Sequence, residues 1–171
     1  MPKVLIVSDS HGLTEEVNLI KQRHINDVEQ MIHCGDSELE MDSDELNQFM
    51  KVAGNCDMDA RFLDEVDFAV TDLRFFVTHG HLFQVKSTLA PLSYRAEELE
   101  AQVICFGHTH IAGAERVGKQ LFINPGSIRL PRVRKEGSYA ILSWESKNNV
   151  LVEFFDIEGE LLEDLTYETT L

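Results

Sequence analysis

Short, mostly apolar runs alternate with amphipathic stretches along the first half of the chain, which is the pattern of a βα fold. Buried strands are predicted at 3–8, 31–34, 49–53 and 103–106. A helix is predicted after Thr14, a capping residue followed by two glutamates, with Val17, Leu19 and Ile20 facing inward. A second helix is predicted from about 87 to 101. An acidic stretch from 38 to 45 reads as a loop with one short helix.

The second half of the chain is dominated by predicted hairpins. Strands at 66–70 and 73–77 flank a turn at 71–72, and strands at 114–117 and 121–123 flank a turn at 118–120. The tail is predicted to form an antiparallel meander of strands at 139–144, 150–155 and 161–166. About ten strands with a few helices favour an α/β architecture of two stacked sheets covered by helices. The length suits a single domain over residues 1–171.

Charge and composition exclude several classes of partner. The 30 acidic and 15 basic residues give a net charge of −15. This argues against binding of long nucleic acid and against docking on an anionic membrane. No apolar run is long enough to span a bilayer, and the first residues lack a signal-peptide pattern. Three cysteines without a C-x-x-C motif favour a reducing cytoplasm.

Five loops that follow predicted strands combine small or turn-forming residues with metal-binding side chains. They are Asp9-x-His11, Gly35-Asp36, Gly54-Asn55, His79-Gly80-His81 and Gly107-His108-x-His110. The carboxyl ends of strands are where open α/β sheets place ligand sites. Carboxylates, imidazoles and an amide suit Mn²⁺, Fe²⁺, Co²⁺, Ni²⁺ or Zn²⁺ better than Ca²⁺. Because one tetrahedral site would leave ligands unused, we expect two ions that share a bridging carboxylate.

Together these motifs resemble the signature of the calcineurin-like metallophosphoesterase superfamily, from residue 3 to about 130. Gly54-Asn55-Cys56-Asp57 and Asn124-Pro125-Gly126-Ser127 are similar to motifs of its small single-domain phosphodiesterase branch. That branch also includes a retromer scaffold subunit. The resemblance implies a four-layer α/β/β/α sandwich of two stacked mixed sheets flanked by helices. It also implies a binuclear metal centre at one end of the sheets.

The resemblance further implies a role for each motif residue. The first ion would be held by Asp9, His11 and His110, the second by Asn55, His79 and His108, and Asp36 would bridge the two. A water or hydroxide shared by the ions would attack a small phosphodiester, so no side-chain nucleophile is required. The expected cofactors are two divalent ions, with Mn²⁺ preferred and Ni²⁺, Co²⁺, Fe²⁺ or Zn²⁺ as alternatives. His81 is expected either near the substrate or in a purely structural role.

One position departs from the pattern of many relatives, which have Gly-Asn-His-Glu at residues 54–57. Cys56 replaces a histidine that is thought to help protonate the leaving group. A thiol is a poor replacement, so diesters with good leaving groups should be favoured. Outside the motifs, His24 and His33 are expected to be structural. Cys34 and Cys105 are expected to be small buried hydrophobic residues.

A cluster of four basic residues follows the Asn124-Pro125-Gly126-Ser127 turn. Arg129, Arg132, Arg134 and Lys135 would either bind the outer part of a phosphodiester or form a solvated loop.

The first alternative function is a non-catalytic or weakly catalytic metal-binding scaffold for protein assembly, and the second is a phosphomonoesterase. The complete ligand set favours the enzyme over the scaffold. Exposed strand edges in the tail are compatible with a homo-oligomer.

Overall fold

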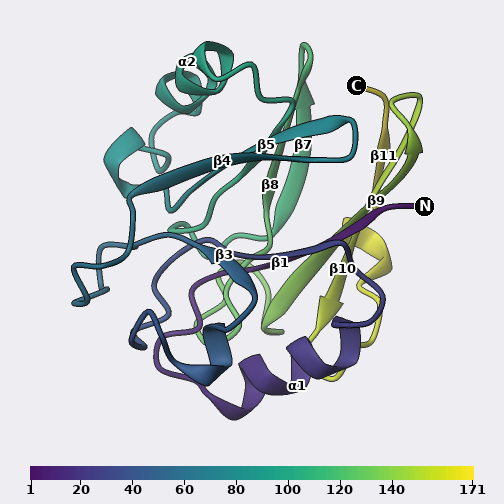
Figure 1. The fold of residues 1–171 in the computed structure, drawn as a ribbon. Helices are drawn as coiled ribbons and strands as arrows, with labels where there is room; N and C mark the ends of the chain where they lie inside the picture. Colours follow the sequence, from purple (N-terminus) through teal and green to yellow (C-terminus); the bar gives the residue numbers. More distant parts are fainter.

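The computed structural model describes residues 1–171, which form eleven strands, two α-helices and three short 3₁₀ helices (Figure 1). The strands are β1 (Lys3–Val7), β2 (Gln30–His33), β3 (Phe49–Lys51), β4 (Glu65–Val70), β5 (Leu73–Thr78), β6 (Val103–Cys105), β7 (Gly113–Val117), β8 (Gln120–Asn124), β9 (Ser138–Ser146), β10 (Asn149–Asp156) and β11 (Tyr167–Thr169). The helices are α1 (Glu15–His24), α2 (Ala90–Glu98), η1 (Asp44–Leu46), η2 (His81–Phe83) and η3 (Glu163–Leu165).

The strands form two mixed sheets. The six-stranded sheet has the order β11-β10-β9-β1-β2-β3, and the five-stranded sheet has the order β4-β5-β6-β8-β7. Strands β1, β2 and β3 are parallel, as are β5, β6 and β8, whereas the hairpins add antiparallel edges. Figure 1 shows the two sheets stacked, with α2 above and α1 below. The predicted four-layer sandwich is therefore confirmed.

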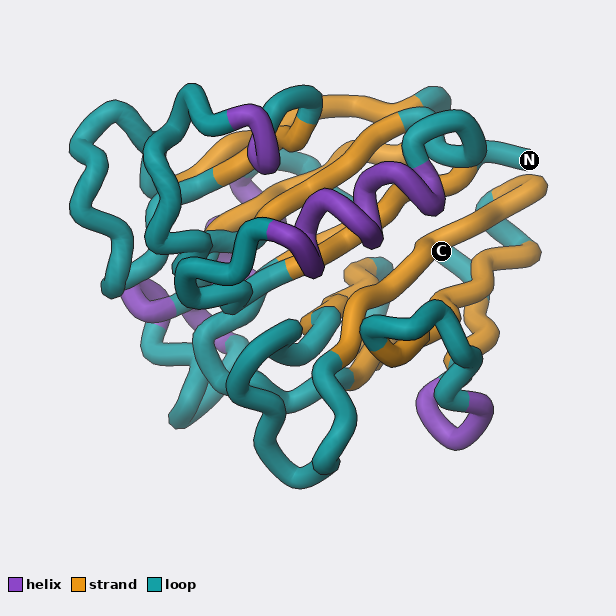
Figure 2. Tube along the Cα trace, turned by 90° about the horizontal axis from the view of Figure 1, so that it is seen from below, coloured by secondary structure: helices purple, strands orange, loops and turns teal.

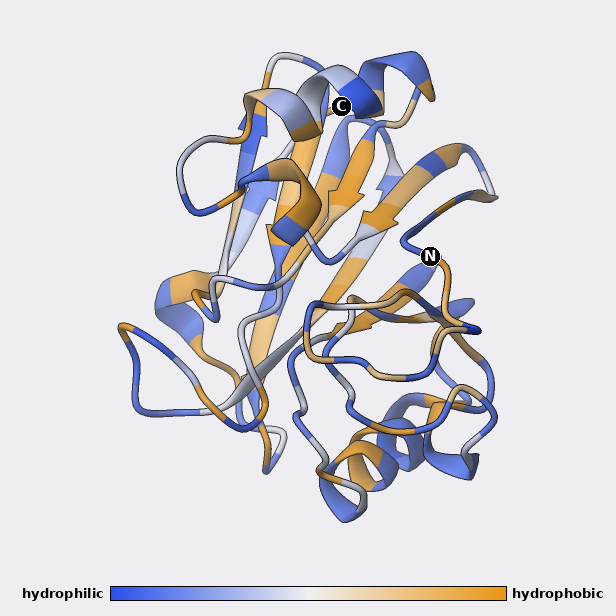
Figure 3. Ribbon diagram, turned by 90° about the vertical axis from the view of Figure 1, so that its left-hand side faces the viewer, coloured by the Kyte–Doolittle hydropathy of each residue, from blue (hydrophilic) through white to orange (hydrophobic).

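Alternation along the strands explains the layers. In β1, Val4 and Ile6 belong to the largest apolar cluster, between the sheets, whereas Leu5 and Val7 pack with residues of α1 on the other face. A third cluster joins the outer face of the five-stranded sheet to α2. Figure 2, seen from below, shows a helix against one sheet, and Figure 3 shows hydrophobic strands between more polar outer layers. No helix has the length and apolar character needed to cross a membrane.

Four local predictions were wrong. The third strand of the tail was expected at 161–166, but those residues include η3, and β11 lies at 167–169. The second helix is shorter than the predicted 87–101, and Pro91 lies in its first turn, where its missing N–H is tolerated. In α1, Leu19 is exposed instead of facing inward. Thr14 does precede α1, but its side chain makes no capping hydrogen bond.

The parallel strands place the motif loops at one end of the sandwich. Loops that follow β1, β2 and β3 leave the six-stranded sheet at the same edge, and those that follow β5 and β6 leave the five-stranded sheet. Hydrogen bonds join the two groups: His108 donates its N–H to Asp9 Oδ2 at 3.1 Å, and His79 Nδ1 donates to the Cys34 carbonyl at 2.8 Å. Within the second group, Gly107 donates its N–H to the His79 carbonyl at 3.0 Å. All five motif loops therefore meet at one end of the molecule.

Candidate metal centre

The loops after β1 and β2 run side by side and hold their backbones in an uncommon conformation. Asp9 donates its N–H to the Gly35 carbonyl at 3.0 Å, and His11 donates to the Asp36 carbonyl at 2.9 Å. Asp9, His11 and Asp36 have φ angles of 52°, 42° and 56°, in the left-handed region. This conformation costs about 1–2 kcal/mol for a residue with a Cβ. It persists where surrounding contacts impose it, as they commonly do at functional sites.

Asp9 lies at the centre of the converging side chains. Its Oδ1 is 3.1 Å from His110 Nε2, 3.6 Å from His11 Nε2 and 3.7 Å from His79 Nε2. This oxygen is buried and accepts no hydrogen bond. Burial opposes ionisation of the carboxyl, but the contacts with His11 and His110 hold the pKa of Asp9 well below its usual range. A buried, ionised oxygen without a hydrogen bond is what a metal cation would satisfy.

Asp36 and Asn55 converge on His79. Asp36 Oδ2 lies 3.2 Å from His79 Nε2 and 3.9 Å from His11 Nε2, and Asn55 Oδ1 lies 3.1 Å from His79 Nε2. Burial of His79 opposes its protonation, but the carboxylate of Asp36 raises the pKa of His79 above its usual value. Burial of Asp36 opposes ionisation, yet the contact with His79 lowers the pKa of Asp36. Without a bound ion, a proton on His79 supplies the positive charge that stabilises the Asp36 carboxylate.

Three imidazoles are oriented in the same way. In each, Nδ1 makes a hydrogen bond to an oxygen that can only accept, so Nδ1 carries the proton. The acceptors are Glu38 Oε1 at 2.7 Å for His11, the Cys34 carbonyl at 2.8 Å for His79 and the Leu130 carbonyl at 2.7 Å for His110. The opposite nitrogens, Nε2, all face Asp9 or Asp36. Protein ligands of metal ions are typically fixed in this way.

His108 and His81 lie next to this cluster. The ring of His108 is 5.1 Å from that of His79, and the ring of His81 is 5.4 Å from His79 and 6.1 Å from His108, measured between centroids. Burial and the neighbouring His79 lower the pKa of His108 to about 4 and lower that of His81 as well. A neutral imidazole is the form that binds a cation. His81 Nδ1 is buried without a hydrogen bond.

The structure therefore brings together all seven residues predicted as ligands. Side-chain ligand atoms lie within 4.8 Å of one another in three sets: Asp9–His11–His110, Asp9–Asp36–His79 and His11–Asp36–Cys56. The first set is the one predicted for the first ion. The unsatisfied Asp9 Oδ1 and the oriented imidazoles fit divalent first-row metals.

Sequence reasoning missed three residues at this centre. Glu38 was assigned to an acidic loop, yet its carboxylate binds His11. Cys56 was considered only as a poor replacement for a proton-donating histidine, yet its sulfur lies within 4.8 Å of ligand atoms of His11 and Asp36. Asp57 was noted only as part of a motif, yet it binds the backbone of the Asp36 loop. For Glu38 the only available signal was its position two residues after Asp36.

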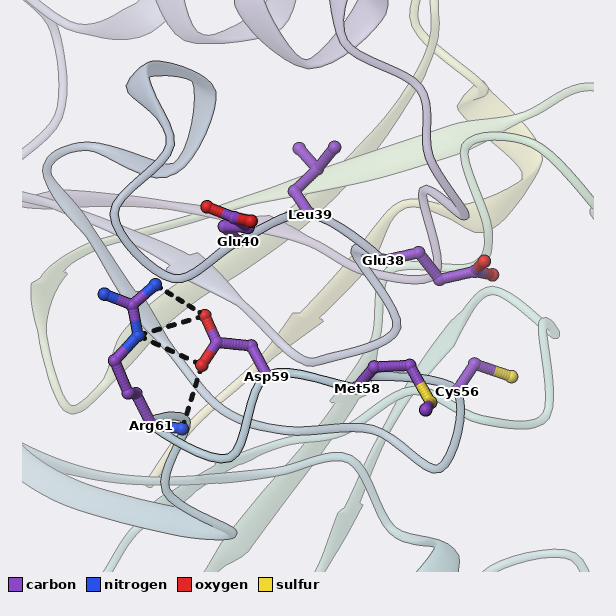
Figure 4. Close-up of a pocket in the computed structure, with 7 residues that line it drawn as sticks. All are labelled: Glu38, Leu39, Glu40, Cys56, Met58, Asp59 and Arg61. Carbon is purple, nitrogen blue, oxygen red and sulfur yellow. Dashed lines mark hydrogen bonds and ion pairs between the residues drawn. The ribbon is translucent and has the colours of Figure 1, made fainter.

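A cavity of about 450 Å³ adjoins the centre. It is lined by Glu38, Leu39, Glu40, Cys56, Met58, Asp59 and Arg61. Figure 4 shows the ends of Glu38 and Cys56 pointing the same way, with the Asp59–Arg61 pair at the far side. Arg61 binds Asp59 and also Asp42, at 2.8 and 2.9 Å. The lining therefore combines three acidic residues and three hydrophobic ones with a single cation, Arg61, that is already paired.

The basic cluster divides into different roles. The guanidinium of Arg129 donates to the His11 carbonyl, which places this cation beside the centre. Arg132 donates its backbone N–H to the His110 carbonyl at 3.0 Å. Arg134 instead pairs with Asp164 and Glu136. Arg134 therefore has carboxylate partners of its own, whereas Arg129 lies next to the centre.

The predictions for the residues outside the motifs can be compared with their surroundings. Cys34 and Cys105 are fully buried in the core between the sheets, as expected. His33 is buried, and its Nδ1 accepts the Gly35 N–H at 3.1 Å while Nε2 meets Ser10 Oγ at 2.9 Å. His24 contacts the Tyr139 hydroxyl at 2.9 Å. Both histidines support neighbouring backbone or side chains.

Residues 2–147 match the calcineurin-like phosphoesterase superfamily domain. The chain therefore belongs to this superfamily of phosphoric ester hydrolases. It is 53% identical over 168 residues to the probable metallophosphoesterase YsnB of Bacillus subtilis, and this alignment covers 98% of this chain and 99% of YsnB. It is also 33% identical over 110 residues to the phosphodiesterase YfcE of Escherichia coli K12, and this alignment covers 56% of this chain and 53% of YfcE.

Solved structures agree with this assignment. A predicted phosphoesterase from Streptococcus pneumoniae superposes with a TM-score of 0.96 at 33% identity, covering 99% of this chain and 98% of the other. Vacuolar Protein Sorting 29 from Cryptosporidium parvum superposes with a TM-score of 0.76 at 17% identity, covering 99% and 97%. The second similarity shows a shared fold.

Proposed function

We propose that the protein is a metal-dependent phosphodiesterase that hydrolyses a small phosphodiester at the centre between the two sheets. The observation that supports this most strongly is the common orientation of three imidazoles toward two buried carboxylates. The relative YfcE is a phosphodiesterase. The net charge of −15 supports a small substrate over long nucleic acid.

The residues would divide between two divalent ions. Asp9, His11 and His110 would hold the first, Asn55, His79 and His108 the second, and Asp36 would contact both. Bound ions of this kind acidify a shared water and neutralise charge on the phosphate during in-line displacement. Mn²⁺ is the proposed metal, because mixed carboxylate and imidazole ligands suit it, and Ni²⁺, Co²⁺, Fe²⁺ and Zn²⁺ are the alternatives.

The side chains around the ions would orient the substrate. The guanidinium of Arg129, next to His11, would bind a phosphate oxygen. His81, beside His79 and His108, would face the substrate. Burial and the Asp36 carboxylate raise the pKa of Cys56 to about 11, so its thiol is a weak proton donor. Aryl esters, whose leaving groups depart without a proton, should therefore react faster than alkyl esters.

The test is hydrolysis of bis-p-nitrophenyl phosphate by metal-free protein to which Mn²⁺ is added. Replacement of Asp36 with Asn should abolish the Mn²⁺-dependent activity, because a shared ligand loses its charge. Asp27→Asn is the matched control, since Asp27 is exposed and lies before β2, at the end of that strand opposite the Gly35-Asp36 loop. Turnover that persists in Asp36→Asn, or that needs no divalent ion in the parent, would contradict the proposal.

The same assay separates the two alternative functions. The fold shared with Vacuolar Protein Sorting 29 supports a scaffold as the second candidate. Absence of turnover with any divalent ion, together with a stable complex with a partner protein, would favour that scaffold. Faster hydrolysis of p-nitrophenyl phosphate than of the diester would favour a phosphomonoesterase.

A further inference from the structure

Two ligand loops of the proposed centre touch through their glycines. A Cβ added to Gly35 would lie 2.8 Å from Gly54 N and 2.9 Å from His79 Nδ1. A Cβ added to Gly54 would lie 2.5 Å from Asp36 N and would overlap the Asp36 carboxylate. The backbones of the loops after β2 and β3 therefore approach each other more closely than any residue with a Cβ would allow. Backbone N–H groups at such a contact need acceptors.

Asp57 supplies those acceptors. Its Oδ2 accepts the N–H of Asp36 at 2.8 Å and that of Gly54 at 2.7 Å, and its Oδ1 accepts the N–H of Glu38 at 2.8 Å. One carboxylate thus joins the loop that carries Asp36 to the loop that carries Asn55. Hydrogen bonds to an ionised acceptor are roughly twice as strong as neutral ones.

This arrangement also sets the direction of the Asp36 carboxylate. Cys56 follows Asn55 in the loop that Asp57 holds, and it donates its N–H to Asp36 Oδ1 at 2.8 Å. With Oδ1 held by the backbone, Oδ2 faces His79 at 3.2 Å and His11 at 3.9 Å. The position of the shared ligand therefore depends on the loop that Asp57 anchors.

We propose that Asp57 is a positioning residue that holds Asp36 and Asn55 at the spacing required by the second divalent ion. The inference rests on the ligand assignment proposed above. Both oxygens of Asp57 accept backbone N–H groups, so no neutral isostere can replace it. An asparagine would turn its own N–H₂ group toward at least one backbone donor.

The experiment compares Asp57→Asn with Asp59→Asn as the matched control. Asp59 lies on the same loop and accepts the N–H groups of Met41 and Arg61 at 2.9 and 3.0 Å, but it contacts no proposed ligand loop. Each substitution is made in two backgrounds. His110→Ala leaves the ligands of the second ion intact, and Asn55→Ala leaves those of the first.

Calorimetric titration of metal-free protein with Mn²⁺ gives the affinity in each background, and urea unfolding without metal gives the stability. Asp57→Asn should weaken binding in the His110→Ala background by about 10–100-fold, as removal of a ligand-supporting group typically does. The loss should be clearly smaller in the Asn55→Ala background, and Asp59→Asn should change neither affinity. Equal losses in both backgrounds, or none, would overturn the inference.

Two further outcomes keep the result decisive. If Asp57→Asn does not fold without metal, Asp57→Glu retains both acceptor oxygens. Recovery of second-site affinity in folded Asp57→Glu supports the inference, and no recovery overturns it. If the parent binds Mn²⁺ and Asp57→Asn binds it equally well, only this inference fails. If the parent binds no divalent ion, the proposed function itself fails.

Discussion

The nitrogen that each histidine presents to the centre is decided by the partner of its other nitrogen. For His79 and His110 that partner is a backbone carbonyl, whereas for His11 it is the carboxylate of Glu38. A carboxylate adds negative charge as well as orientation. The close contact with the Asp9 carboxylate, opposed by burial and helped by Glu38, raises the pKa of His11 to about 9. His11 is therefore protonated at neutral pH when no ion is bound.

This protonation predicts that metal binding releases a proton from His11, because an imidazole ligand must be neutral. Since the proton is bound below about pH 9, the apparent Mn²⁺ affinity should rise with pH and level off above about pH 9. Glu38→Gln lowers the pKa of His11, so fewer protons should be released and the rise should shift to lower pH. Calorimetry of Mn²⁺ binding in buffers of different ionisation enthalpy measures the protons released.

Glu40→Gln serves as the control, because Glu40 lines the same cavity without a hydrogen bond to His11. Equal proton release by the parent and Glu38→Gln would show that Glu38 does not set the pKa of His11. The residues that converge at the centre were predictable from motif spacing, but Glu38 was not. Its φ of 55° turns the chain back toward His11, and nothing in an acidic run of sequence specifies that turn.

At the scale of elements, the strand ends were the predictable part of the fold. An apolar run that ends in glycine fixes where a strand stops, and parallel strands bring those ends to one edge. The tail was less predictable. Leu162, Leu165 and Tyr167 pack against the main core, and the first two do so from the 3₁₀ segment around η3. An apolar run covers a core equally well as a strand or a short helical turn, so hydrophobicity alone misplaced β11.

Contact between the loops makes a prediction about Gly54. In Gly54→Ala the new methyl group would overlap the Asp36 carboxylate and lie 2.5 Å from Asp36 N, so the Asp36 loop must move. Overpacking of this kind typically costs about 1–3 kcal/mol of stability. We expect that loss in urea unfolding, together with loss of Mn²⁺-dependent hydrolysis. In Gly113→Ala, where nothing lies within 4 Å, stability should stay within about 0.5 kcal/mol of the parent. Similar behaviour of the two variants would contradict the role of the glycine contact.

At the scale of the whole molecule, the centre is a junction between the two sheets. Asp9, His11, Asp36 and Asn55 follow strands of the six-stranded sheet, whereas His79, His108 and His110 follow strands of the five-stranded sheet. Elsewhere the sheets are joined mainly by an apolar core, and away from the centre Trp144 Nε1 donates to Asp72 Oδ1 and the Arg116 N–H donates to the Tyr167 hydroxyl, both at 2.9 Å. Ions bound at the junction would therefore cross-link the sheets at one end only. They would also offset part of the net charge of −15.

This geometry predicts that chelation destabilises the protein unevenly. At an ion concentration of 100 times Kd, binding contributes about 2.7 kcal/mol. For a chain of this size that corresponds to a fall in Tm of about 5–10 °C on metal removal. Hydrogen exchange should accelerate in the loops at 9–12, 35–38 and 107–110. It should not change in the hairpin turns at 71–72 and 118–119, which precede β5 and β8 and so lie at the ends of these strands that are remote from the centre. Asp36→Asn should show no chelator effect, and uniform acceleration along the parent chain would contradict a cross-link confined to one end.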